Sequence, residues 1–414
     1  MTLQTAGLER NVRLYPWYAA SFNAFFWMPV FFLYFSEQFP LETVLLLEAI
    51  YYAAVVIFEV PSGYFSDAIG RRPTLLISAS AIVAACALFF FGSGFLLFAA
   101  AQVCLAVGIA FNSGTDTSFH YDSLAALGKE HEYGDREARA ARNAFIAAAI
   151  AALLGGGAAV LQLRFAYGLS LVAGLVTLGI VAACIEPTAR ERAARLGVVG
   201  QLRACAGFLG RPVLRWLFGF AVLMTVLNHV PYEFYQPYFG LVMGDLRMPG
   251  EGAPLVAGLH MAAAMLLGSW FAAKSIRLRD RIGVGPVLLA AAVLQTVIIV
   301  VMGFVLHAVV VALILLRTAP RALMSAPLNA AIAPQIPQAQ RATYLSMQSL
   351  AGRLSFSVVL VALSYVAGPG AAADWPVISL MLRFSAALAV VGLLWLALTM
   401  RPSLSSLRTP RIGG

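Results

Sequence analysis

Apolar stretches of membrane-spanning length recur along almost all of this 414-residue chain. A transmembrane helix needs about 20 predominantly apolar residues to cross the hydrocarbon core of a bilayer. We expect twelve such spans, at residues 15–36, 42–66, 73–93, 95–119, 143–162, 166–185, 213–236, 253–273, 285–305, 308–332, 343–366 and 377–399. The pattern therefore predicts an all-α integral membrane protein with twelve transmembrane helices.

The low content of charged residues supports this class. Charged residues make up 11% of the chain, against about 25% in soluble domains. A soluble protein with so little charge could not cover its surface, whereas lipid covers most of a membrane protein. The first apolar stretch is too long for a cleaved signal peptide, so we expect it to be a true span. The four cysteines form no C-x-x-C pair, which predicts buried thiols without disulfides or metal.

The distribution of positive charge predicts the orientation. Of the 28 Lys and Arg residues, five lie in or beside the expected spans. If the N-terminus is cytoplasmic, two of the others, Arg164 and Arg247, fall in outside loops and the remaining 21 fall in cytoplasmic segments. Cytoplasmic loops of membrane proteins carry such an excess of Lys and Arg. We therefore expect both termini inside the cell, in the cytoplasmic (inner) membrane of a bacterium.

The longest hydrophilic stretch divides the chain into two halves. It is rich in Arg, and within it residues 196–209 are suited to a short amphipathic helix on the membrane surface. We expect an N-terminal six-helix bundle at 1–185, a cytoplasmic linker at 186–212 and a C-terminal six-helix bundle at 213–414. Two bundles joined in this way are typical of transporters built from parallel repeats.

A polar motif follows the second expected span. It reads Gly63-Tyr64-Phe65-Ser66-Asp67-Ala68-Ile69-Gly70-Arg71-Arg72. Gly63 permits close helix approach, Asp67 can accept hydrogen bonds, Gly70 permits a tight turn, and the two arginines hold the loop in the cytoplasm. The matching loop of the second half contains Asp280-Arg281-Ile282-Gly283, which repeats the Asp-x-x-Gly spacing.

This motif resembles the signature of the major facilitator superfamily, G-x-x-x-D-x-x-G-R-[KR], and the resemblance extends over essentially the whole chain. It implies two six-helix bundles and a gating latch at Gly63, Asp67, Gly70, Arg71 and Arg72, with Asp280 and Gly283 as its second copy. In the family this latch is thought to stabilise the outward-facing state.

Other segments are similar to a bacterial subgroup of exporters of drugs, metabolites or siderophores: residues 59–63, 113–116, 121–124, 341–343 and 349–353. Two positions depart from the patterns of the superfamily. Gln102 stands where many members carry an Arg in span four, and no proline lies near Gly155-Gly156-Gly157 in span five. Both departures weaken the expectation of proton antiport.

Ionisable residues at membrane depth are costly and are therefore functional candidates. In the first half these are Glu48 and Glu59 in span two, and Asn112, Asp116 and His120, which follow one another at helical i, i+4 spacing. We name Glu48, Asn112, Asp116 and His120 as candidates for substrate binding or proton coupling. The alternatives are a structural hydrogen-bond network and, at Asp116 and His120, a metal site.

The second half contributes Asn228 and Glu233 beside Pro231, where we expect a bent or broken helix. It also contributes Arg317 and Arg321, at i, i+4 spacing, and Arg353. Arginine binds carboxylate or phosphate through two hydrogen bonds, so these residues are suited to an anionic substrate. Alternatively they pair with Asp116 or Glu48 in a gating network, or simply hold the two halves together.

The chain lacks the G-x-x-x-x-G-K-[ST], G-x-S-x-G and H-E-x-x-H motifs, so we expect neither ATP binding nor hydrolase chemistry. We predict a secondary active transporter that exports a small organic solute, anionic or amphiphilic, by proton-coupled alternating access. It is expected to be a monomer without cofactor, metal or nucleic acid, whose partners are the substrate, protons and membrane lipids. The alternatives are a lipid flippase or scramblase on the same fold, and a membrane enzyme built around Asp116, His120 and Asp122.

Overall fold

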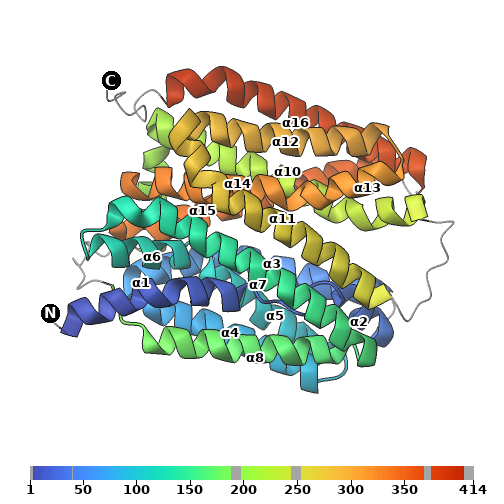
Figure 1. The fold of residues 1–414 in the computed structure, drawn as a ribbon, viewed down its shortest axis with the longest axis horizontal. Helices are drawn as coiled ribbons and strands as arrows, with labels where there is room; N and C mark the ends of the chain where they lie inside the picture. Colours follow the sequence, from blue (N-terminus) through green and yellow to red (C-terminus); the bar gives the residue numbers. More distant parts are fainter. Residues whose placement is uncertain (1–2, 40, 188–196, 244–252, 368–373, 405–414) are drawn as a thin grey trace.

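The computed structural model describes residues 3–39, 41–187, 197–243, 253–367 and 374–404. Every regular element in these ranges is a helix, and most helices run along the long axis of the molecule (Figure 1). The helices of the first half occupy the lower part of Figure 1 and those of the second half the upper part. Both ends of the chain lie at the same end of the molecule.

The first half contains eight α-helices and one short 3-10 helix in its described residues. They are α1 (Leu3–Phe22), α2 (Phe31–Gln38), α3 (Leu41–Ile69), α4 (Arg71–Phe91), α5 (Phe95–Asn112), α6 (Thr115–Ala125), η1 (Glu130–Glu132), α7 (Tyr133–Leu161) and α8 (Arg164–Ala183). The amphipathic helix expected in the linker is present as α9 (Val198–Gly207), followed by η2 (Phe208–Gly210).

The second half has the same character. Its described elements are α10 (Pro212–Met243), α11 (Ala253–Ile282), α12 (Val284–Phe304), α13 (Ala308–Ile314), η4 (Leu315–Thr318), α14 (Ala319–Ile332), η5 (Ala333–Gln335), α15 (Gln338–Ala367) and α16 (Trp375–Ser403). Each expected span overlaps one of these helices or a run of two or three consecutive ones.

Each half has its own apolar core. The core of the first half is centred on aromatic side chains such as Phe89, Phe98 and Tyr167. The core of the second half is built around Trp216, Phe220 and Leu382. Smaller clusters join the halves, notably Ala138 of α7 with residues of α11 and α14. Each half is thus packed internally, which is what a rigid body needs.

Among the described residues, ten helices or helix runs are long and apolar enough to cross a membrane. A bent helix, α3, raises the number to eleven, because its two parts meet at an angle of 40° beside Pro61. The remaining expected span, 15–36, corresponds to α1 and α2 and the turn between them. Many membrane-spanning helices are therefore present, while the total of twelve stays a prediction.

Three of the expected spans are not continuous helices. Span one is interrupted between α1 and α2, where the hydroxyl of Ser170 accepts hydrogen bonds from the backbone N–H groups of Phe26 (3.0 Å) and Trp27 (3.4 Å). Span four breaks between α5 and α6 at Gly114, which has φ +70°. Span ten tightens into the 3-10 helix η4. Near Pro231, where a bent or broken helix was expected, α10 continues as one helix, so the span is not broken there, and a bend stays a prediction.

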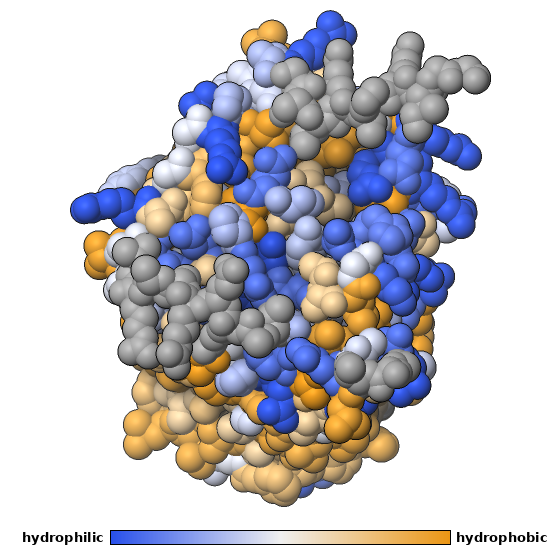
Figure 2. Space-filling model, turned by 90° about the vertical axis from the view of Figure 1, so that its left-hand side faces the viewer, coloured by the Kyte–Doolittle hydropathy of each residue, from blue (hydrophilic) through white to orange (hydrophobic). Residues whose placement is uncertain are grey.

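The end of the molecule that carries both termini is polar. Figure 2 shows this end, where hydrophilic side chains gather over much of the face and hydrophobic side chains lie along its edge. Such a face suits the cytoplasmic side predicted from the Arg and Lys distribution.

Candidate functional site

The turn of the polar motif is built around Gly70, between α3 and α4. Its φ of +136° is unfavourable for residues with a side chain, and a Cβ there would lie 2.8 Å from an Oε2 of Glu186. The Glu186 carboxylate accepts hydrogen bonds from the backbone N–H groups of Arg71 and Arg72, each at 2.9 Å. A carboxylate at the N-terminus of α4 also interacts favourably with the helix dipole. The turn therefore fixes the start of α4 and the position of its first residue, Arg71.

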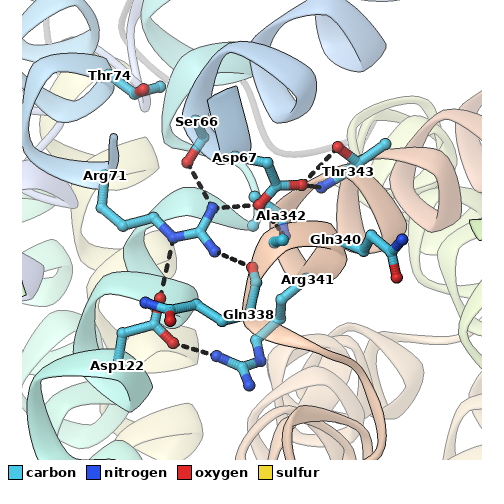
Figure 3. A network of polar contacts seen from close by, with 12 residues as sticks. Ser66, Asp67, Arg71, Thr74, Asp122, Gln338, Gln340, Arg341, Ala342 and Thr343 are labelled. Carbon is cyan, nitrogen blue, oxygen red and sulfur yellow. Dashed lines mark hydrogen bonds and ion pairs between the residues drawn. The ribbon is translucent and has the colours of Figure 1, made fainter. Parts of the chain in front are cut away.

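Asp67 connects the first half of the chain to the second. One of its oxygens, Oδ2, accepts hydrogen bonds from the backbone N–H of Thr343 (2.8 Å) and from the Thr343 hydroxyl (2.5 Å). Its other oxygen accepts one from the N–H of Ala342 at 3.3 Å. Both partners lie in the first two turns of α15 (Figure 3). The side chain at the end of α3 thus holds the start of a helix from the opposite bundle.

Arg71 extends this contact into a chain of alternating charges (Figure 3). Its guanidinium contacts Asp67 at 2.5 Å and Asp122 at 3.1 Å, and donates to the carbonyl of Gln338 at 2.6 Å. Arg341 of α15 binds the other oxygen of Asp122. All four charged side chains are buried. Removing one member of such a buried set leaves its partner unpaired, which costs about 3–5 kcal/mol.

Close helix contacts reinforce the same junction. A Cβ at Gly63 would lie 2.7 Å from the hydroxyl of Ser346, and a Cβ at Gly114 would lie 2.7 Å from Cβ of Leu345. The Ser346 hydroxyl also donates to the carbonyl of Ser113 at 3.3 Å. At this end of the molecule α3 and α6 are therefore packed directly against α15.

The second copy of the motif reproduces the turn and not the contact between halves. Gly283, between α11 and α12, has a φ of +93° and so repeats the conformation of Gly70. Asp280 is 58% exposed, and its ion pair is with the neighbouring Arg279 at 2.7 Å. The two copies share a backbone requirement, while the cross-bundle contact belongs to Asp67.

The candidates of span four lie in a buried polar network among α1, α5, α6 and α7. Asn112 donates to Asp116 at 3.3 Å and accepts a hydrogen bond from the Tyr18 hydroxyl. His120 lies against Glu137, with 2.8 Å between Nδ1 and Oε2. The helix break at Gly114 does not separate these residues, since α6 continues the polar face that Asn112 begins.

Glu137 was not among the residues singled out from the sequence. It falls in a charged segment, between Asp135 and Arg139, that was assigned to the cytoplasm as a whole. The spacing of Tyr133, Glu137 and Ala140 places all three on one face of a helix, and all three are buried in α7. A carboxylate on the apolar face of a helix is a stronger candidate than one in a solvated run of charges.

The two glutamates of α3 have different partners. Glu48 accepts a hydrogen bond from Gln102 at 3.0 Å, so the glutamine that departs from the family pattern has a specific role here. Glu59 is fully buried and lies 3.7 Å from Arg353 of the opposite half. An ion pair of Arg353 with Glu48 or Asp116, one of the alternatives above, is not among its described contacts, and its pair with Glu59 fits the alternative in which acidic partners hold the two halves together.

The polar side chains of the second half gather around Tyr235. The guanidinium of Arg317 lies 4.6 Å above the Tyr235 ring, and the ring of His260 stacks with it at 5.8 Å. Arg317 is only 7% exposed. Neither Arg317 nor Arg321 forms an ion pair with a carboxylate in the described part of the chain. Their positive charges are thus not neutralised by any of the carboxylates that the structure describes.

Several polar side chains of this region are exposed. Arg321 of α14 is exposed. Tyr52 of α3 and Tyr232 of α10 have exposed fractions of 41% and 38%. Glu233 is also accessible, whereas Asn228 keeps a buried carbonyl oxygen without a hydrogen-bond partner among the described residues. The accessible groups come from both bundles.

The structure offers no metal site in its described residues. There, no group of three or more His, Cys, Asp or Glu side chains is placed to hold a metal ion. The four cysteines are free thiols.

Comparisons with known proteins give a consistent result. The model of the Major Facilitator Superfamily matches residues 17–360. The E. coli fucose:proton symporter FucP has 16% identity and a TM-score of 0.68, over 95% of this chain and 99% of that one. The human organic anion transporter MFSD10 has 14% identity and a TM-score of 0.72, over 96% of this chain and 100% of that one.

A bacterial homologue of the iron transporter ferroportin, in an outward-facing state, has 16% identity and a TM-score of 0.68, over 97% and 100%. At these identities the likeness shows the shared fold. No curated protein sequence matches the chain.

Proposed function

Because this chain belongs to the Major Facilitator Superfamily, we propose that it is a secondary active transporter that exports a small organic anion, or an anionic amphiphile, in a proton-coupled cycle. The substrate would bind between the two six-helix bundles and be exposed to each side of the membrane in turn. The contacts of Asp67, Arg71, Asp122 and Arg341 would hold the cytoplasmic end closed in one of the two states.

The arginines of the second half carry the substrate proposal. Arg317 is buried without an ion pair among the described carboxylates, and the exposed Arg321 likewise forms none there. Burying an unpaired charge is costly, so such residues are retained where an anion can neutralise them. A carboxylate or phosphate would accept two hydrogen bonds from a guanidinium. An organic anion transporter is among the proteins of similar fold, but the proposal rests on these side chains.

The proposal of proton coupling rests on three carboxyl groups. Glu48 and Glu233 stand on opposite bundles, and Asp116 lies in the buried network of the first half. A proton can shift the equilibrium between two states only by binding one of them more tightly. Carboxyl groups whose surroundings change as the bundles move meet this requirement.

Transport by purified protein in proteoliposomes would test the proposal. A pH gradient is imposed, a pH-sensitive dye reports proton movement, and carboxylates, chelators, drugs and labelled lipids are offered in turn. We expect proton movement that requires one organic anion. Proton movement with no solute of the panel, together with movement of labelled lipid, would instead support the flippase alternative.

The arginine assignment has a matched control. Arg317→Gln removes the charge beside Tyr235 and should raise the KM for the anion by at least about ten-fold, corresponding to about 1.4 kcal/mol. Arg383 also lies over an aromatic ring, that of Phe304, and donates to a backbone carbonyl. Arg383→Gln should leave the KM within about two-fold. Equal effects of the two substitutions would contradict a substrate role for Arg317.

A further inference from the structure

Two ionisable side chains are in contact between α6 and α7, and a third lies one helical turn away. His120 is 1% exposed, and its Nδ1 lies 2.8 Å from Oε2 of Glu137. The Tyr15 ring of α1 stacks on the imidazole at 3.8 Å, which fixes its plane. Asp116 lies one helical turn before His120 on α6. We refer to Asp116, His120 and Glu137 as the acid–histidine cluster.

The cluster lacks a permanent cation. No Arg or Lys forms an ion pair with Asp116 or Glu137 in the described part of the chain. The nearby cations of the surrounding helices bind other carboxylates: Arg71 of α4 and Arg341 of α15 bind Asp122, and Arg279 of α11 binds Asp280. The other titratable groups around the cluster are the neutral side chains of Tyr15 and Tyr18 of α1 and Tyr133 of α7.

This charge balance favours an exchangeable proton. With both carboxyl groups ionised and the imidazole neutral, two negative charges would lie close together in a buried place, which is unfavourable. One added proton, held between Nδ1 of His120 and Oε2 of Glu137, would leave a single negative charge.

The cluster also borders the junction of the two bundles. A small cavity beside it is lined by Thr117 and Tyr133 from the first half and by Asn329, Arg341 and Leu345 from the second. The backbone N–H of Thr117 donates to Asp116 at 2.7 Å, and the Tyr133 ring lies 5.4 Å from that of His120. Protonation of the cluster would therefore change the electrostatic environment of the contact between the two halves.

The helices that carry the cluster hold that contact. α6 also carries Asp122, which binds Arg341 of α15. α7 packs on the second half on either side of Glu137: a Cβ at Gly134 would lie 2.9 Å from the guanidinium of Arg279, and Ala138 packs with Ile276 and Ala326. The hydrogen bond between His120 and Glu137 is thus a link between two helices that both contact the opposite bundle.

We propose that the acid–histidine cluster of Asp116, His120 and Glu137 is a proton-binding site of this transporter, and that the bond between His120 and Glu137 couples its proton to closure of the cytoplasmic end. The proposal rests on the proton-coupled function above and names the group that carries its proton. A protonated His120 bound to ionised Glu137 makes a charge-assisted hydrogen bond, which is stronger than the neutral one. The stronger bond would hold α6 and α7 in the arrangement in which both contact the second half, so we expect low pH to favour the closed end and loss of the proton to favour its opening.

A distance measurement tests this with protons as the only ligand. Nitroxide labels are placed at Ala125 and Arg203, both exposed, in purified full-length protein whose four native cysteines are replaced. Pulsed electron paramagnetic resonance then measures the distance distribution between about pH 5 and pH 8, the range in which histidine titrates. In the parent protein we expect the distance to increase as the pH rises.

Two substitutions are compared. Glu137→Gln keeps the size of the side chain but removes its ionisation, and should abolish the pH dependence of the distance. Glu132→Gln is the matched control, because Glu132 pairs with Arg136 at a partly exposed position five residues earlier; it should behave like the parent. If Glu137→Gln does not fold, His120→Gln replaces it, with the same expectation. Glu137→Asp should restore part of the response, which a purely structural role would not require.

The outcomes separate this proposal from the proposed function. A pH response that is absent from the parent, or unchanged in Glu137→Gln and His120→Gln, would overturn the role of the cluster, while proton-coupled transport in proteoliposomes would stand. A response that depends on Glu137, together with no proton movement for any solute tested, would refute the proposed proton coupling and leave the cluster as a pH switch.

Discussion

At the scale of single residues, Arg71 is the side chain on which most contacts of the closed end depend. Its guanidinium bridges Asp67, Asp122 and the carbonyl of Gln338. This position depends on two neighbours that never touch the opposite half. Gly70 supplies a backbone conformation that other residues avoid, and Glu186 holds the first N–H groups of α4. The motif and Glu186 together therefore fix the position of the Arg71 side chain.

Substitution of Asp67 tests the closed end. Asp67→Asn keeps an oxygen that can accept from Thr343 but removes the ion pair with Arg71, so the state with a closed cytoplasmic end should lose stability. We expect turnover in proteoliposomes to fall by at least about ten-fold, with a smaller change in substrate binding, because a buried pair is broken away from the binding site.

Asp280→Asn is the control for this experiment, since Asp280 is exposed and pairs only with its neighbour among the described residues. It should change turnover by less than about two-fold. Transport by Asp67→Asn at the parent rate would show that the contact with α15 does not control the cycle.

At the scale of helices, the broken spans and close approaches are the features that matter. Gly156 of α7 and Gly258 of α11 allow two backbones to meet: a Cβ at Gly156 would lie 2.7 Å from the carbonyl of Pro254, and one at Gly258 would lie 2.5 Å from that of Ala152. α7 and α11 come from different bundles. Their contact runs from Gly134 near one end to Gly156 near the other.

Enlarging Gly156 should therefore separate α7 from α11. Gly156→Val should lower the thermal stability of the purified protein, because overpacking of a tight contact costs about 1–3 kcal/mol. Gly157 has no neighbour within 4 Å of its Cβ position, so Gly157→Val is a control for the propensity of valine in the same helix. Equal melting temperatures for the two variants would contradict a close α7–α11 contact.

Helix positions were largely predictable from the sequence, and helix breaks were not. The expected span 285–305 corresponds to α12 (Val284–Phe304), because lipid requires an uninterrupted apolar stretch of defined length. The break at residues 23–30 lies inside a mainly apolar stretch, so hydropathy does not reveal it. It depends on tertiary partners such as Ser170, which hydrogen-bonds the exposed backbone.

Dependence on partners distant in sequence also limited prediction of the site. Asp67, Gly70 and Arg71 were found because their pattern is local. Arg341 and Glu137 act through partners that are distant in sequence or on another helix. Each lies in a polar segment that looks like an ordinary cytoplasmic loop.

At the scale of the whole molecule, two separate cores meet along an interface of small side chains, glycines and one buried charge network. Both termini lie at the polar end shown in Figure 2. The expected orientation places this end in the cytoplasm, where Lys and Arg are enriched.

Labelling of intact cells would test the orientation. Single cysteines at Ala125, near the polar end, and at Arg164, the first residue of α8 beyond the far end of α7, are treated with a membrane-impermeant maleimide in a background without native cysteines. We expect Arg164→Cys to react in intact cells and Ala125→Cys to react only after permeabilisation, because the chain should have its positive end inside. The reverse pattern would invert the predicted topology.

The arrangement around Arg71 also bears on how the two halves separate. Opening this end breaks the contacts of Arg71 with Gln338, of Asp67 with Thr343 and of Asp122 with Arg341 together, and a partly opened end would leave the buried Arg341 unpaired, which is costly. Partly separated cytoplasmic ends are therefore the least stable arrangement, and the entrance should change between closed and open in a single cooperative step. A carrier with such an entrance would spend little time in forms through which protons could pass without substrate, so the proposed proton coupling would be tight.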